Sequence, residues 1–62
     1  MCLSKVYLKT NSGLELVMEE TATVQVDGNT IILTDLFGRA EKVDAKIQQI
    51  DLVASKIILI NS

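Results

Sequence analysis

Apolar and polar residues alternate along most of this 62-residue chain. In residues 2–9 one side carries Cys2, Ser4, Val6 and Leu8, and the other carries Leu3, Lys5, Tyr7 and Lys9. A period of two residues is typical of a β-strand, because successive side chains point to opposite faces. Similar patterns predict six or so short strands, at 2–9, 14–19, 22–27, 30–35, 46–52 and 56–61, with a short extended segment at 40–43.

Turn-forming residues separate these segments. Residues 11–13 (Asn-Ser-Gly) and 27–29 (Asp-Gly-Asn) predict hairpin turns, and the second is the strongest turn signal in the chain. Another turn is expected near residues 37–39. Residues 45–50 could instead form one helical turn, since Ile47 and Ile50 are three residues apart.

The composition also favours sheet. Ile, Val and Thr make up 18 of the 62 residues, and these side chains suit strands because they are stiff at χ1. The chain has no Pro, and its three Gly residues fall at the predicted turns. We therefore predict an all-β fold with a single domain over residues 1–62. Its expected form is a small antiparallel β-barrel, SH3-like or OB-like, of about six short strands.

Two predicted strands are apolar on both faces, namely 31–33 (Ile-Ile-Leu) and 57–60 (Ile-Ile-Leu-Ile). A single-layer barrel buries only one face of each strand, so the other face needs a cover. Either the barrel folds over itself and leaves a modest exposed patch, or a second copy of the chain covers the patch. A homodimer would also stabilise a domain of this small size.

Size and charge exclude several classes of function. The chain is too short for an enzyme with separate cofactor and substrate domains. Its net charge of −2 disfavours binding to nucleic acid. No apolar run approaches the length of a membrane span, the first residues contain no apolar signal core, and a lone thiol suits a reducing compartment, so we expect a soluble cytoplasmic protein.

Catalytic groups are scarce. With no His, the chain has no Ser-His-Asp or Cys-His pair and no ordinary His-bearing zinc site. Glu19 and Glu20 are adjacent on a predicted strand edge and would point to opposite faces. We expect that the protein is not an enzyme and that it has no catalytic residues.

Cys2 is the residue with the most chemistry. A lone Cys is often a small buried hydrophobe, but removal of Met1 would leave a thiolate and a free α-amine on one residue, able to chelate a metal. With the amide of Leu3 this makes a compact nitrogen and sulfur donor set that suits square-planar Ni(II) or Cu(II). One chain still lacks four strong donors. Two Cys2 residues across a twofold axis would supply two thiolates, or an intermolecular disulfide under oxidation.

A second hypothesis is an interaction module without metal. Lys5, Tyr7 and Lys9 share one face of the first predicted strand and would contact RNA or a protein. The plainest alternatives are a half-covered strand with solvated lysines and a structural dimerising domain whose thiol only packs.

Three segments resemble a known family over nearly the whole chain. They are the opening MCLSKVYL (1–8), the central GNTIILTDLFG (28–38), and the closing KIQQIDL (46–52) with KIIL (56–59). In this order and spacing they resemble the CooT family of small nickel-binding proteins. The resemblance implies a dimeric β-barrel that binds Ni(II), about one ion per dimer, through Cys2. It also implies a role in the maturation of nickel-dependent carbon monoxide dehydrogenase, and many members carry the older description of predicted RNA-binding protein.

Hydrogenase maturation chaperones of the HypC type also begin with Met-Cys and form small β-barrels. Their start usually has a Pro a few residues on, where this chain has Ser4 and Lys5. That difference argues against the hydrogenase interpretation. From the CooT resemblance only Cys2 transfers as a metal ligand, because it alone matches the metal residue of that family.

Overall fold

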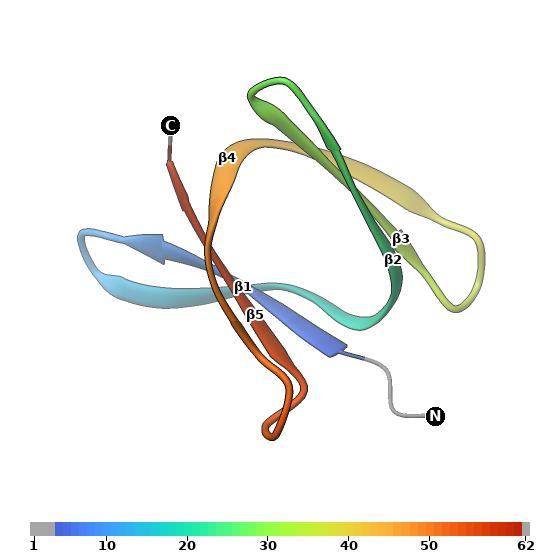
Figure 1. Cartoon of the computed structure of the whole chain (residues 1–62), viewed down its shortest axis with the longest axis horizontal. Helices are drawn as coiled ribbons and strands as arrows, with labels where there is room; N and C mark the ends of the chain where they lie inside the picture. Colours follow the sequence, from blue (N-terminus) through green and yellow to red (C-terminus); the bar gives the residue numbers. More distant parts are fainter. Residues whose placement is uncertain (1–3, 62) are drawn as a thin grey trace.

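The computed structural model describes residues 4–61, which form five β-strands closed into a barrel (Figure 1). The strands are β1 (Ser4–Thr10), β2 (Gly13–Asp27), β3 (Thr30–Asp35), β4 (Ala40–Asp51) and β5 (Lys56–Asn61). The predicted all-β barrel is confirmed, and the expected turns lie between the strands. In the tight turn between β2 and β3, Gly28 has a φ of 62°, the left-handed conformation that Gly adopts without steric cost.

Two of the strands are longer than the sequence pattern indicates. The segments predicted at 14–19 and 22–27 form one strand, β2, and those at 40–43 and 46–52 form β4. The helical alternative for residues 45–50 is wrong, because these residues are extended and paired with β5. Neither Pro nor Gly interrupts the long strands, and shifts in register, such as the one between Thr21 and Thr23, absorb their bends.

Each strand pairs with its neighbours in chain order, and β5 closes the ring against β1. The four pairs of consecutive strands are antiparallel, whereas β1 and β5 are parallel. This closing pair follows from the number of strands. When five strands alternate in direction, the first and the last run the same way.

The long strands each belong to two parts of the barrel. Residues 13–21 of β2 pair with β1 and residues 21–27 with β3, whereas residues 40–44 of β4 pair with β3 and residues 45–51 with β5. Figure 1 shows both strands curving as they pass from one neighbouring strand to the other. At the two changes of partner lie Thr21 and Ala45, whose side chains are small and buried.

The core lies inside the barrel. Its buried apolar residues are Val6, Ile31, Leu33, Ala45, Ile57 and Leu59, with Leu8, Val17, Met18, Val24 and Val43 packed against them. Each fully buried Leu or Ile side chain contributes about 1.5–3 kcal/mol through the apolar surface that it removes from water. Within residues 4–61, no helix has the length and apolarity needed to cross a membrane.

The strands that are apolar on both faces point one face into this core. Ile31 and Leu33 of β3 are buried, and Ile32 between them is half-buried on the outside. In β5, Ile58 and Ile60 are likewise half-buried outside. Ile58 lies beside Tyr7 of β1 and Gln49 of β4, so neighbouring strands cover part of it. The outer faces are thus partly covered within one chain.

A buried carboxylate organises the turn between β3 and β4. Asp35 is 8% exposed, and its Oδ1 accepts the backbone N–H groups of Phe37 and Arg39, each at 2.9 Å. Its Oδ2 accepts Nε–H of Arg39, also at 2.9 Å. The turn is tied to β2 as well, since the N–H of Leu36 donates to the carbonyl of Glu20 at 2.9 Å.

These contacts change the acidity of Asp35. Burial raises its pKa, but the hydrogen bonds from the Arg39 backbone, the Arg39 side chain and the Phe37 backbone outweigh burial, and the nearby Arg39 charge adds to them. The pKa of Asp35 therefore lies below its ordinary value of 3.8. As the pH falls, the Asp35 carboxylate is protonated in the unfolded chain before it is protonated in the folded chain. Its contribution to the free energy of unfolding is therefore complete above about pH 4 and is lost as the pH drops through the pKa of the folded state.

We predict that Asp35→Asn lowers the urea midpoint of unfolding at pH 7, because an amide cannot accept the Arg39 Nε–H at the Oδ2 position. The loss of stability of the native chain below pH 4 should also become shallower in the variant. Urea titrations from pH 7 to pH 2 measure both effects, with Asp27→Asn in the exposed β2–β3 turn as control. Parallel pH profiles for native and Asp35→Asn chains would contradict this role.

Candidate metal centre at the amino-terminal end of the barrel

The predicted metal ligand, Cys2, lies outside the described residues, and the structure defines the place from which it extends. Ser4 at the start of β1 pairs with Thr21 of β2. The N–H of Lys5 donates to the carbonyl of Ser55 in the β4–β5 turn at 3.0 Å. In the sequence, Cys2 precedes the first residue of β1 by two positions.

A buried hydroxyl lies at the same end. Thr21 is 4% exposed, and its Oγ1 has no hydrogen-bond partner among residues 4–61. Thr21 is opposite Ser4 in one register and opposite Asp35 in the other, so it borders both β1 and β3. A hydroxyl can donate one hydrogen bond and accept two, and leaving it unpaired in the interior costs about 1–3 kcal/mol. It is therefore available to a group bound near the start of β1.

Sequence reasoning missed Thr21. The alternation along β2 gives no sign that this residue is where the strand changes partner, and Thr is as common on outer faces as on inner ones.

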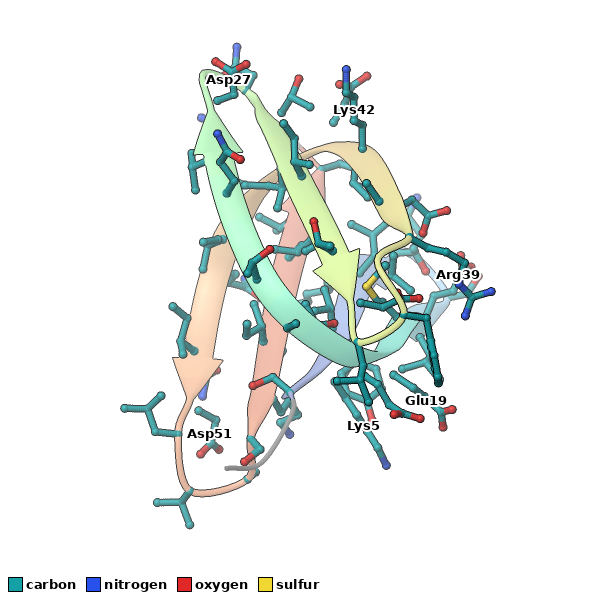
Figure 2. The ribbon with its side chains drawn as sticks, turned by 90° about the vertical axis from the view of Figure 1, so that its right-hand side faces the viewer. Lys5, Glu19, Asp27, Arg39, Lys42 and Asp51 are labelled. Carbon is teal, nitrogen blue, oxygen red and sulfur yellow. The ribbon has the colours of Figure 1, made fainter. Side chains whose placement is uncertain are left out.

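Two turns near this end carry exposed apolar side chains. They come from the β3–β4 and β4–β5 turns and form what we call the apolar rim: Leu36 (56% exposed), Phe37 (69%), Leu52 (85%) and Val53 (99%). The hydrogen bond of Leu36 to Glu20 attaches the β3–β4 turn to β2, and the hydrogen bond of Lys5 to Ser55 attaches the β4–β5 turn to the start of β1. In Figure 2, Lys5, Glu19 and Asp51 mark this end at the bottom of the view. Large apolar side chains that are this exposed are candidates for a contact surface.

The β4–β5 turn holds its part of the rim in a defined shape. Oδ1 of Asp51 accepts the N–H groups of Val53 at 3.1 Å and Ala54 at 3.0 Å. Ser55 follows with a φ of 54°, in the left-handed region. Because local hydrogen bonds order the turn, its apolar side chains are presented to solvent in a defined arrangement.

The described part of the chain has no ready-made cage for a metal. Within residues 4–61, no group of three or more His, Cys, Asp and Glu side chains is placed to hold an ion. The hypothesis of a metal site thus rests on Cys2.

The residues of the interaction-module hypothesis do share a face. Lys5, Tyr7 and Lys9 lie on the outer side of β1, opposite the buried Val6. The parallel pairing with β5 adds Lys56 beside Lys5 and places Ile60 between Lys9 of β1 and Lys46 of β4. Four of the six basic residues of the chain are on this outer face. Sequence reasoning missed Lys46 and Lys56, because only the pairing of β5 with β1 and with β4 brings them onto the same face as Lys5, Tyr7 and Lys9.

Comparison with known proteins agrees with the fold and with the resemblance of the motifs. The chain is 36% identical to an uncharacterized protein of Methanocaldococcus jannaschii over 59 aligned residues. The alignment covers 95% of this chain and 96% of the relative. A crystal structure assigned as CooT from Carboxydothermus hydrogenoformans superposes with a TM-score of 0.88 at 23% identity, over 98% of both chains, and supports the fold.

The sequence profile of one family matches residues 1–60, nearly the whole chain, and its description is CO dehydrogenase accessory protein CooT. The match includes Cys2, Thr21 and all five strands except Asn61, the last residue of β5. The chain therefore belongs to the CooT family of CO dehydrogenase accessory proteins.

Proposed function

We propose that two copies of this chain bind one Ni(II) ion between their Cys2 thiolates and hold it for delivery to, or storage for, a nickel enzyme. Carbon monoxide dehydrogenase or its maturation machinery is the proposed recipient, in keeping with the accessory role of the family. The role is one of metal handling without catalysis. The observation that carries the proposal is the setting of β1, which starts beside a buried hydroxyl with no hydrogen-bond partner among residues 4–61 and near the exposed apolar rim.

The donor set fits the metal. A thiolate is a soft ligand, and a set of nitrogen and sulfur donors in a square plane suits Ni(II). Each chain offers the Cys2 sulfur together with nitrogen from the amine or the adjacent amide. Two chains complete four donors, and the nickel is cargo that the pair releases.

The apolar rim gives the two chains a reason to meet at this end. In a twofold dimer the same patch contacts itself, so each rim covers the other. Leu52 and Val53 are almost fully exposed in one chain, and burying them stabilises a domain whose own core is small. Because Cys2 precedes the start of β1 by only two positions in the sequence, contact between the two rims brings the two sulfurs towards the axis.

Thr21 supplies the partner of the ligand sulfur in this proposal. Its hydroxyl lies beside the start of β1 and has no acceptor within residues 4–61. By donating a hydrogen bond to the thiolate it would stabilise the charged form of the ligand and orient it.

We predict that Ni(II) titration of the metal-free protein reaches saturation at about one ion per two chains, with a thiolate-to-nickel charge-transfer absorption. Cys2→Ala should keep the fold, measured by circular dichroism, and lose tight binding. Affinity should weaken as the pH falls, because a thiol with an ordinary pKa of about 8.5 must lose its proton to bind. Tight binding that survives in Cys2→Ala would rule the proposal out.

Thr21→Val should weaken nickel binding by about tenfold or more, the usual effect of removing a hydrogen bond to a metal ligand. The metal-free variant should be as stable as the native chain or more stable, since it loses a buried hydroxyl that has no partner. Thr21→Ser, which keeps the hydroxyl, is the matched control and should bind nickel with nearly native affinity. Equal affinities for the Val and Ser variants would remove Thr21 from the site.

The basic outer face supports a second candidate, an RNA-binding module. Tyr7 offers a ring for stacking, and Lys5, Lys9 and Lys56 lie around it. For this candidate, single-stranded RNA should bind with an affinity that falls steeply with salt concentration, survives in Cys2→Ala and decreases in Lys5→Gln. Fluorescence anisotropy measures all three effects. Absence of RNA binding at low salt excludes the candidate.

A further inference from the structure

A groove runs along the barrel between β2 and β4; its lining does not include Thr21, and it shares Phe37 with the apolar rim. Two adjoining hollows of ≈ 510 Å³ and ≈ 370 Å³ form it, and Leu16, Val17 and Glu41 line both. Its other lining residues are Leu8, Glu15, Met18, Glu19, Glu20, Asp35, Phe37, Arg39, Ala40, Lys42 and Val43. Figure 2 shows Glu19 and Arg39 on this side of the barrel and Lys42 farther along β4.

The groove lies where both long strands have a free edge. Residues 13–19 of β2 pair only with β1, and residues 40–44 of β4 pair only with β3, within the part of the chain that the structure describes. On such an edge every second residue directs its N–H and C=O away from the sheet. An extended peptide segment placed in the groove would have backbone N–H and C=O groups of β2 on one side and those of β4 on the other.

The floor of the groove is apolar. Val17, Met18 and Val43 are half-buried there and pack against the core, and the more exposed Leu16 and Phe37 extend the apolar surface towards the rim. A segment that alternates in character can therefore place one set of side chains on this floor.

The charges of the groove are mostly negative. It is lined by Glu15, Glu19, Glu20 and Glu41, which are all the glutamates of the chain. The carboxylate of Asp35 is already engaged by Arg39, which leaves Lys42 as the other cation of the lining. An occupant with basic side chains complements this surface.

Two of the glutamates occupy inward positions of their strands. Glu15 is opposite Leu8, and Glu41 is opposite the buried Leu33, so both lie on the side of the sheet that faces the barrel interior. Both are nevertheless exposed and line the same smaller hollow, because β2 and β4 do not pair with each other here. A lysine or arginine side chain that enters the hollow would meet carboxylates from both edges.

We propose that this groove binds an extended peptide segment of a partner protein by addition of a β-strand to residues 13–19 of β2, with aliphatic and basic residues in turn at the positions that face the groove. The backbone of the segment pairs with the free edge, its aliphatic side chains cover Val17 and Met18, and its basic side chains face the glutamates. This binding does not use Cys2 and does not depend on nickel. A second copy of this chain as the occupant is a distinct outcome of the test.

A capped synthetic peptide with valine and lysine in turn at every second position and serine at the others, long enough to pair with residues 13–19, is the probe. Added to the full chain without metal, it should bind saturably by fluorescence anisotropy, and more weakly at higher salt. Amide hydrogen exchange in residues 13–19 should slow on binding. The Cys2→Ala chain should bind it equally well, so that failure of the nickel proposal leaves this result unaffected.

Paired variants separate the contributions. The double variant Glu15→Gln and Glu41→Gln should bind the peptide about tenfold more weakly, because glutamine keeps the shape of glutamate but two charge pairs are lost. Asp27→Asn, at the distant β2–β3 turn, should leave peptide binding unchanged. A peptide N-methylated at alternate residues along one edge keeps its charge but loses its backbone donors, and it should not bind.

Three results would overturn the proposal. One is equal binding of the N-methylated peptide, which would mean attraction of charge alone. Another is peptide binding without slower exchange in residues 13–19. The last is a change in the oligomeric state of the Glu15→Gln and Glu41→Gln variant together with no peptide binding to the native chain, which would make the groove an interface between copies.

Discussion

The structure depends on the bending of two long strands across one small core. β2 and β4 each pair with one neighbour over their first part and with another over their second part. The bends are possible because the residues at the changes of partner, Thr21 and Ala45, are small enough to be buried where the layers meet. Without these bends, five strands of this length would form an open sheet with two long free edges.

Both candidate sites are consequences of these bends. At one end the bend of β2 buries the hydroxyl of Thr21 next to the start of β1, where the chain leading to Cys2 enters. Along the side, the same bend turns residues 13–19 away from β3 and leaves their outer edge beside the glutamates. The fold thus places the buried Thr21 hydroxyl and the free edge of β2 at different parts of the barrel.

Much of the fold could be predicted from the sequence. The alternation of apolar residues and the turns at 27–29 and 37–39 define the strands and the all-β class, because side-chain period and turn chemistry are local properties. The continuity of β2 and β4 and the parallel closure of β5 on β1 could not be predicted. They result from packing between strands that are distant in the chain, so Lys56 beside Lys5 and the unpaired Thr21 had no sequence signal. Cys2 was singled out by its chemistry and by the resemblance to the CooT family, and that family membership is confirmed over residues 1–60.

The central claim is that sulfur from two chains meets at one nickel ion, and X-ray absorption at the nickel edge tests it most directly. For protein loaded with one nickel per two chains, the fine structure should show two sulfur scatterers per metal, accompanied by lighter donors. A nickel environment with one sulfur or none, in protein that remains folded, would contradict the account.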